Sequence, residues 1–161
     1  MKDALVVYFS RTGYTRRIAE DVARAIGADC EAIREPAPRT GFLGYWRSAR
    51  EAWREATIEI EASSRNPRDY ALVVLGTPVW AGNVSSPLRA YIARHKRDFG
   101  RVALFCTQGG SGAQKVLQRM AELCDQRPVA TAFFADAEID RGLYTGKLDA
   151  FAAALAARQA A

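Results

Sequence analysis

Three side-chain hydroxyls lie within six residues near the start of the chain, at Ser10, Thr12 and Thr15, with Gly13 between them. Hydroxyl groups and backbone N–H groups are neutral donors that can hold a phosphate without a lysine or a metal ion. A Ser or Thr ahead of a helix often only caps it, but three hydroxyls exceed what one cap requires. The stretch therefore predicts a phosphate-binding loop.

The residues on either side of this loop predict the elements that position it. Residues 4–9 are an aliphatic run that predicts a strand, and residues 14–26 carry apolar side chains at helical spacing, with Gly27 as a stop signal. A strand, a short polar loop and a helix N-terminus together direct backbone N–H groups and the positive end of the helix dipole at a bound anion.

Two later loops also follow predicted strands. The continuous apolar run 70–75 ends at Gly76, and the loop after it contains Trp80, Ala81, Gly82 and Asn83. The run 101–106 is followed by a glycine-rich loop at residues 107–112. An indole offers a surface on which a flat ring can stack, and glycines allow the backbone to approach a ligand closely.

Strands alternate with helices along the whole chain, which predicts an α/β fold with a doubly wound, five-stranded parallel sheet. Such a sheet binds ligands beyond the carboxyl ends of its strands, where the three loops would meet. The remaining predicted strands lie at 29–34 and 129–135, and the remaining helices at 42–56, 87–96 (with Ser86 as its cap), 113–124 and 148–155. Loops are predicted at 36–41, 57–69 (with a short extended piece at 58–60) and 136–146.

Length and composition favour one domain spanning residues 1–161 in a reducing compartment. Cys30, Cys106 and Cys124 are odd in number and widely spaced, which argues against a disulfide framework or a zinc site and favours the cytoplasm. The single histidine, His95, offers no partner set for a metal or a catalytic triad. We expect no transmembrane segment and no signal peptide, since no apolar run is long enough for either.

The charge balance is basic, with 23 Lys and Arg against 18 Asp and Glu and a formal net charge of +5. Because the excess is spread among the predicted helices instead of forming one block, we expect no nucleic-acid partner and read these charges as solvated helix faces.

Several phosphate-binding classes are excluded by the loops themselves. Residues 142–148 are one residue short of a P-loop and lack its final hydroxyl, and the first turn holds Gly13 alone where a dinucleotide fold needs Gly-x-Gly-x-x-Gly. A receiver domain needs an aspartate where this third strand ends in Gly76, and a tyrosine phosphatase needs a cysteine where Ser10 stands. A mononucleotide remains, with its phosphate on the first loop and its ring between the other two.

The first strand, loop and helix resemble the phosphate signature of the flavodoxin family. That signature requires aliphatic and aromatic residues, then a Ser or Thr, a small residue, a Thr, an Ala and a final aliphatic residue at fixed spacing. The chain meets it with Val6, Val7, Tyr8, Ser10, Gly13, Thr15, Ala19 and Val22. The likeness extends over essentially the whole chain and is to a short-chain member, because the last strand carries no long insertion.

The resemblance implies strand order 2-1-3-4-5 and a non-covalently bound FMN. It implies that the phosphate is held by Ser10, Arg11, Thr12, Gly13, Tyr14 and Thr15. It also implies that one side of the flavin contacts Pro78, Val79, Trp80, Gly82 and Asn83, and that its other side is rimmed by Thr107, Gln108, Gly109, Gly110, Ser111 and Gly112. The flavin itself would do the chemistry, so no catalytic acid, base or nucleophile and no metal ligand is predicted.

Two departures from the family leave the function open. Many electron-carrying flavodoxins are acidic, whereas this chain is basic, with Arg11, Arg16 and Arg17 beside the proposed phosphate site. Those carriers also commonly place an aromatic residue in the second flavin loop, whereas residues 108–112 contain none. An uncovered flavin face would admit a nicotinamide or a quinone, unless Tyr144 or Trp46 covers it.

Three functions follow from these expectations. The first is an electron carrier that passes electrons to a redox partner protein, an acidic one given the basic chain. The second is a small FMN-dependent oxidoreductase acting on NAD(P)H and a quinone-like acceptor. The third is a regulatory or scaffold domain without flavin, which the intact phosphate loop disfavours. The family resemblance favours the carrier.

Overall fold

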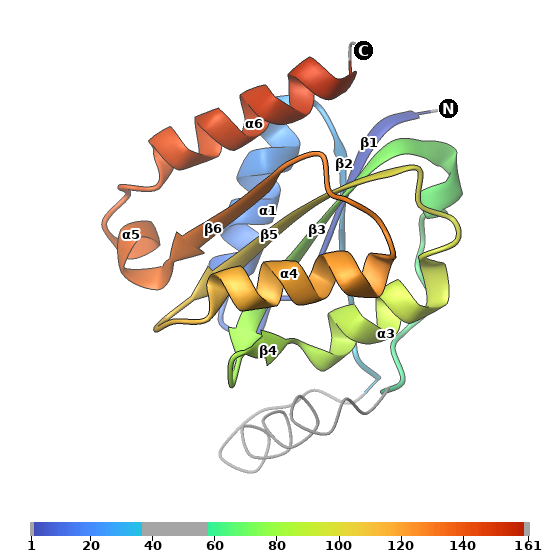
Figure 1. Cartoon of the computed structure of the whole chain (residues 1–161), viewed down its shortest axis with the longest axis horizontal. Coiled ribbons are helices and arrows are strands. Elements are labelled where there is room, and N and C mark those ends of the chain that lie inside the picture. The colour runs from blue at the N-terminus through green and yellow to red at the C-terminus, as the bar shows by residue number, and fades with distance from the viewer. Residues whose placement is uncertain (1, 37–57, 160–161) are drawn as a thin grey trace.

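The computed structural model describes residues 2–36 and 58–159, and the helix predicted at 42–56 lies outside them (Figure 1). A parallel sheet runs through the centre in the order β2-β1-β3-β5-β6, and a short strand, β4, pairs antiparallel with the end of β3. This is the predicted order 2-1-3-4-5 with β4 added. The strands are β1 (Lys2–Tyr8), β2 (Asp29–Ala32), β3 (Tyr70–Trp80), β4 (Asn83–Val84), β5 (Arg101–Gln108) and β6 (Thr131–Ala135).

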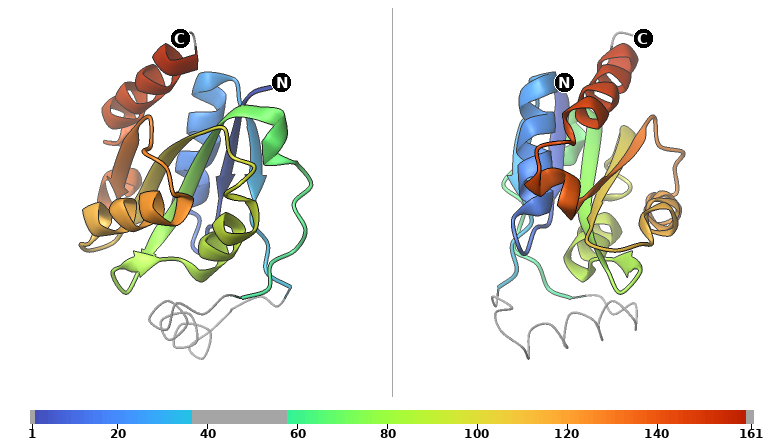
Figure 2. Two further views of the ribbon diagram at one scale, coloured as in Figure 1. Left: turned by 45° about the vertical axis from the view of Figure 1, so that its right-hand side comes forward. Right: turned by 90° about the vertical axis from the view of Figure 1, so that its left-hand side faces the viewer.

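Helices cover both faces of the sheet (Figure 2). One face packs against α1 (Tyr14–Ile26) and α6 (Thr145–Gln159), and the other against α3 (Ser86–His95) and α4 (Ala113–Cys124). A short helix, α5 (Asp136–Asp140), follows β6 directly, and a 3₁₀ turn, η1 (Pro67–Asp69), precedes β3. The fold is therefore the doubly wound α/β fold that the sequence predicts.

The middle residues of the central strands are apolar because both faces of the sheet are buried there. In β1, Val7 packs into the core under α3 and α4, and Val6 packs into the core under α1 and α6. In β5, Leu104 and Phe105 divide in the same way. Uninterrupted apolar runs such as these are typical of a parallel sheet that helices cover on both faces.

The prediction that the third strand ends before Gly76 is wrong, because β3 continues to Trp80. Gly76 lies beside Phe105 on the neighbouring strand, and a Cβ added at this glycine would come within 2.1 Å of the Phe105 ring. The glycine is needed so that the ring can lie over the strand. Pro78 and Val79, predicted to lie in a loop, are therefore held on a strand beyond that ring.

Other predicted boundaries also shift. Strands β1, β2, β5 and β6 begin or end a few residues from the predicted limits, and residues 58–60 form no strand. The prediction that Ser86 caps the next helix is wrong, because Ser86 is the first residue of α3 and Ser85 is its N-cap residue. Helix α5 lies in a predicted loop. It begins where the Glu138 carboxylate accepts a hydrogen bond from the Ala135 N–H, at 3.1 Å between Oε2 and N. Helices α1 and α4 occupy the predicted ranges.

Candidate functional site

The predicted phosphate loop leaves the carboxyl end of β1 and turns into α1 at Gly13. Its start is fixed to β3 by a hydrogen bond from the Phe9 N–H to the Gly76 carbonyl, at 3.1 Å. Gly13 is the N-cap residue of α1 with φ of 104°, in the left-handed region where glycine meets no steric penalty. The Gly13 N–H donates to Ser10 Oγ at 3.1 Å, so this hydroxyl shapes the loop.

The first turn of α1 is arranged to favour an anion. Its N-cap residue, Gly13, offers no capping side chain and the turn holds no acidic residue, so among the described residues no such acceptor is assigned to its N–H groups. Arg16 and Arg17 lie in that turn with exposed side chains, and Thr12 is exposed just before it. Donors and cations thus surround the helix N-terminus, as a phosphate site requires.

Thr15, the third predicted hydroxyl, is used inside the protein. Its side chain is 1% exposed, and its Oγ1 lies 2.8 Å from Oγ1 of Thr107, which is itself buried. This hydrogen bond joins the start of α1 to the end of β5. Two residues predicted to contact the ligand separately are therefore brought together by the fold.

A pocket of about 410 Å³, which we call the edge pocket, opens where the three predicted loops meet at the carboxyl ends of the strands. Its walls come from the phosphate loop, from the end of β3 with its turn, from β5 and from the start of α5. The lining residues are Arg11, Thr12, Tyr14, Pro78, Val79, Trp80, Ala81, Thr107, Gly109 and Asp136. Its size is within the usual range for a small-molecule site.

The wall formed by β3 and β4 is a tight hairpin. Its two central turn residues, Ala81 and Gly82, have φ of 48° and 72°, the backbone sign that a two-residue hairpin turn needs. Trp80 precedes the turn, and its ring meets the Phe9 ring edge to face, with centroids 5.3 Å apart. The indole is only partly buried, so it retains surface toward the edge pocket.

The wall formed after β5 is a glycine-rich loop. Gly112 has φ of 106° and is the N-cap residue of α4, and Gln108 Oε1 accepts a hydrogen bond from the Ala113 N–H at 3.0 Å. An ideal Cβ built at Gly112 would lie 3.5 Å from the Gly82 Cα, so this loop passes close to the hairpin turn. The predicted second and third loops are therefore neighbours in space.

Eight predicted residues line the edge pocket, and the other nine lie outside its walls. The loop backbones are shaped by Ser10, Gly13, Gln108 and Gly112, and Thr15 pairs with Thr107, as described above. Gly110 and Ser111 lie exposed in the loop after β5, and Gly82 and Asn83 line a second cavity beside the turn.

Sequence reasoning missed Ala81 and Asp136. Asp136 follows β6 directly, and its Oδ2 would lie 3.1 Å from a Cβ added at Gly109, which places the carboxyl group against that glycine. It makes no hydrogen bond or ion pair within the described parts of the chain. Burial, and then the charge of Asp140, raise the pKa of Asp136 above its ordinary value. The signal was available, since the end of the last strand lies at the same edge of the sheet.

Tyr14 connects the phosphate loop to α5. Its hydroxyl donates to Asp140 Oδ2 at 3.0 Å, and this hydrogen bond is the main cause that raises the pKa of Tyr14. Tyr144, which the sequence left as a possible cover for the ring site, is buried instead. Its hydroxyl donates to Asp21 Oδ2 at 2.8 Å and accepts from Arg17 Nε at 3.1 Å.

Neither a metal centre nor a membrane span is found in residues 2–36 and 58–159. No group of three or more His, Cys, Asp and Glu side chains is placed to hold a metal ion. No helix in these ranges combines the length and the apolar character needed to cross a bilayer.

Solved structures with this fold include several flavoproteins. A flavoprotein from Lactobacillus acidophilus, crystallised in complex with FMN, is 22% identical with a TM-score of 0.73, over 88% of this chain and 98% of that one. A flavodoxin, WrbA-like protein from Agrobacterium tumefaciens is 16% identical with a TM-score of 0.65, over 99% and 96% of the two chains. A flavodoxin from the domain Archaea is 16% identical with a TM-score of 0.63, over the whole of both chains.

No curated protein matches this sequence. The family model described as flavodoxin matches residues 3–131, a range that includes the phosphate loop, β3 with its turn, and the loop after β5. This match covers well over half of the chain, and it agrees with the strand order and with the position of the edge pocket. The chain therefore belongs to the flavodoxin family.

Proposed function

We propose that this chain binds FMN without a covalent bond in the edge pocket and transfers electrons through it. The observation that carries the proposal is the joining of an anion site at the α1 N-terminus to a ring-sized pocket walled by Trp80. Family membership supports it, as does the FMN found in the Lactobacillus acidophilus flavoprotein.

The described residues fit the parts of FMN. Arg11, Thr12 and Tyr14, together with the first-turn N–H groups of α1, would hold the phosphate end. Ser10, Gly13 and Thr15 would keep that loop in shape through the hydrogen bonds described above. The donor set is neutral hydroxyls, backbone N–H groups and exposed guanidinium groups, which suits a phosphate without a metal ion.

The ring end of FMN would lie between the hairpin and the loop after β5. Pro78, Val79 and Trp80 form one wall of the edge pocket and exclude water there, and Thr107 and Gly109 form the other. Gly82, Asn83, Gln108, Gly110, Ser111 and Gly112 would complete the two loops. The flavin supplies the redox chemistry when it is bound, and the chain binds, orients and shields it.

The first candidate function is electron carriage to a redox partner protein. Family membership supports this role, and the basic chain favours an acidic partner. Association would then be steered by opposite charges, which makes its rate sensitive to salt.

The second candidate is an FMN-dependent NAD(P)H:quinone-type oxidoreductase. Its support is the absence of an aromatic cover from the described loop after β5, which offers only glycines, Gln108 and Ser111. Tyr144 is buried and engaged with Asp21 and Arg17, so it cannot serve as that cover in this arrangement. Trp46 lies outside the described residues. An open outer face would let a flat substrate ring stack on the flavin.

We also propose that the protein works in the cytoplasm. The support is that all three cysteines, Cys30, Cys106 and Cys124, are free thiols. Burial raises the pKa of Cys106 and of Cys124 to about 12, so both are poor nucleophiles and poor candidates for redox chemistry of their own.

Comparing FMN with riboflavin tests the proposed binding. We expect the purified protein to bind FMN far more tightly, because riboflavin lacks the phosphate that the α1 N-terminus would hold. Fluorescence titration with both ligands measures the difference, and equal affinities would overturn the assignment of the phosphate site. Steady-state assays of the FMN-loaded protein with NADH, NADPH and a quinone then separate the two candidates, since a pure carrier oxidises neither dinucleotide.

A further inference from the structure

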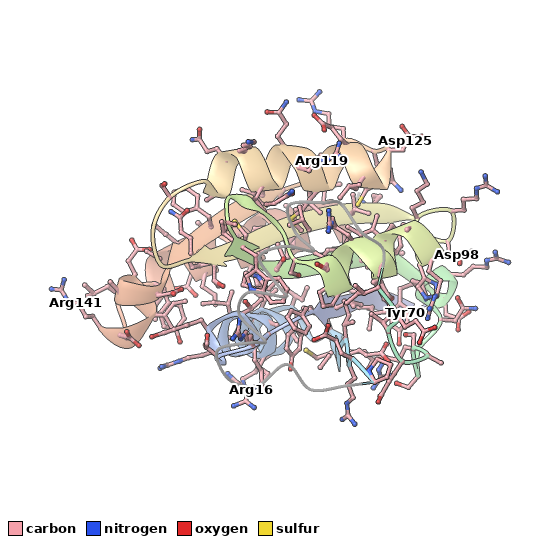
Figure 3. The ribbon with its side chains drawn as sticks, turned by 90° about the horizontal axis from the view of Figure 1, so that it is seen from below. Arg16, Tyr70, Asp98, Arg119, Asp125 and Arg141 are labelled. Atoms are coloured by element: carbon pink, nitrogen blue, oxygen red, sulfur yellow. The ribbon has the colours of Figure 1, made fainter. Side chains whose placement is uncertain are left out.

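A second cavity, of about 430 Å³, lies directly beside the edge pocket, and we call it the side cavity. Ala81 lines both, so the hairpin turn is their common wall. The opposite wall is one face of α4, where side chains three or four residues apart point the same way. The residues of this cavity are Ala81, Gly82, Asn83, Lys115, Gln118, Arg119 and Glu122. Figure 3 shows Arg119 partway along α4 and Asp125 beyond its end.

The polar groups of the side cavity favour an anion. Lys115 is exposed and has no acidic partner in the described parts of the chain. Arg119 Nη1 contacts Glu122 Oε2 at 3.1 Å, and Glu122 Oε1 also accepts from Gln118 Nε2 at 3.4 Å. The cavity thus holds two cations and one acid, and an ion pair at an exposed rim contributes little to stability. An incoming phosphate would gain the Lys115 charge without breaking a strong interaction.

We infer that the side cavity is a subsite for the phosphate groups of a nicotinamide dinucleotide whose nicotinamide ring stacks on the outer face of the FMN held in the edge pocket. The reason is the shared wall at Ala81: a ligand with a flat ring and phosphates in one molecule would reach from the flavin into the side cavity. A phosphate-free quinone would stack on the flavin without using the side cavity. The inference rests on the second candidate function and names the part of the chain that would select its electron donor.

Binding of the oxidised dinucleotides to the FMN-loaded protein tests this assignment without requiring turnover. NAD⁺ and NADP⁺ are titrated by calorimetry into wild type, Lys115→Gln and Lys115→Glu. The matched control is Arg127→Gln, which removes one positive charge from an exposed residue beyond the far end of α4, and that end of the helix lies about 14 Å from Lys115 at the helical rise. Inorganic pyrophosphate is titrated in parallel, to separate a site for any phosphate from one for a dinucleotide.

We expect Lys115→Gln to weaken dinucleotide binding by roughly 5- to 150-fold, the usual effect of losing one charge-assisted hydrogen bond. Lys115→Glu should weaken it further, and Arg127→Gln should leave it within about two-fold. Pyrophosphate should compete with the dinucleotide but bind more weakly, since it lacks the ring. Within the described ranges Lys115 has no acidic partner to lose, so the variants should keep the unfolding midpoint and the FMN affinity of the wild type.

Three results would overturn the inference: no dinucleotide binding to the wild type, equal binding by wild type and Lys115→Glu, or the same loss in Arg127→Gln. Pyrophosphate binding as tightly as either dinucleotide would show a plain anion site. None of these results touches the proposed FMN site, because FMN affinity is measured separately on the same variants. Oxidation of NADPH with unchanged binding in Lys115→Glu would leave the oxidoreductase standing and remove only the subsite.

Discussion

The two threonines of the phosphate loop have different roles in the structure. Thr12 is exposed in the edge pocket, whereas Thr15 is buried and bonded to Thr107. We therefore expect Thr12→Val to weaken FMN binding by about 1–3 kcal/mol, the value of a hydrogen bond to a charged group, while changing stability by less than about 0.5 kcal/mol. Thr15→Val should instead lower the free energy of unfolding by about 1–3 kcal/mol, because it leaves the buried Thr107 hydroxyl unpaired.

Fluorescence titration and urea unfolding of both variants separate the two roles. Riboflavin serves as the control ligand, since its affinity should not respond to Thr12→Val. If Thr12→Val weakens the binding of riboflavin and of FMN by the same factor, the Thr12 hydroxyl does not contact the phosphate.

Trp80 is the indole we expect to contact the flavin, because it lines the edge pocket with part of its ring uncovered. FMN binding should quench tryptophan fluorescence, and Trp80→Phe should remove most of that quench while retaining the ring contact with Phe9. Trp46 and Trp53 lie outside the described residues, so each needs its own Phe variant. A quench that persists without Trp80 would assign the contact to one of them.

Asp136 should make stability depend on pH. Its carboxyl has a pKa raised above the ordinary 3.8 by burial and by Asp140, so the folded state holds its proton more tightly than the unfolded state does. The charge penalty is therefore absent below the ordinary pKa, grows as pH rises through the raised value, and is full at neutral pH. We expect Asp136→Asn to stabilise the flavin-free protein at pH 7 and to have a smaller effect near pH 4.

Urea unfolding of Asp136→Asn at both pH values measures this difference. Asp149→Asn is the matched control, since Asp149 is exposed on α6. A gain that is equal at pH 4 and pH 7, or one that Asp149→Asn reproduces, would show that the Asp136 charge is not the cause.

At the scale of elements, the hairpin of β3 and β4 contains a strained backbone conformation at Ala81 that a substitution can relieve. Ala81 has φ of 48°, a left-handed conformation that costs an alanine about 1 kcal/mol, and Gly82 beside it has φ of 72°. We expect Ala81→Gly to stabilise the protein by about 0.5–1 kcal/mol despite the flexibility that glycine adds to the unfolded chain. Gly82→Ala should destabilise it by about 1 kcal/mol, and thermal unfolding of the pair tests both signs. Equal midpoints for the two variants would contradict the turn geometry.

The elements that the sequence predicted well are those set by local signals. Helix α1 occupies residues 14–26 as predicted, because its apolar spacing and the stop at Gly27 are both local features. The end of β3 was missed because Gly76 leaves room for the Phe105 ring, and Phe105 is distant in sequence but adjacent in space. Helix α5 was missed because five residues are too few to show a helical period.

The residues of the candidate site also differ in whether a local signal predicts them. The phosphate loop and Trp80 were predicted from short motifs, and both line the edge pocket. No local motif marks Asp136, and its only signal was the predicted strand order, which brings the end of the last strand to the same edge of the sheet. The bond between Thr15 and Thr107 likewise joins residues 92 positions apart, and only the packed sheet brings them together.

At the scale of the whole molecule, the formal net charge of +5 should act on the redox potential of bound FMN. Reduction adds negative charge to the flavin, so surrounding cations favour it and raise the potential. One unit charge about 8 Å away, at an effective dielectric constant of about 40, contributes roughly 1 kcal/mol, or about 45 mV for one electron. Arg11 lines the edge pocket, and Arg16 lies in the first turn of α1 (Figure 3).

We therefore expect the potential to become more negative as salt is raised, because the screening length falls from about 30 Å at 0.01 M to about 3 Å at 1 M and removes the influence of these exposed cations. Arg11→Gln should lower the potential by some tens of millivolts at low salt and by less at high salt, while Arg127→Gln, beyond the far end of α4, should change it little. Potentiometric titration of the FMN-loaded variants at two salt concentrations measures both effects. A potential that rises with salt, or that responds equally to Arg11→Gln and Arg127→Gln, would show that the basic surface does not set the potential, and that nearby acids such as Asp136 outweigh it.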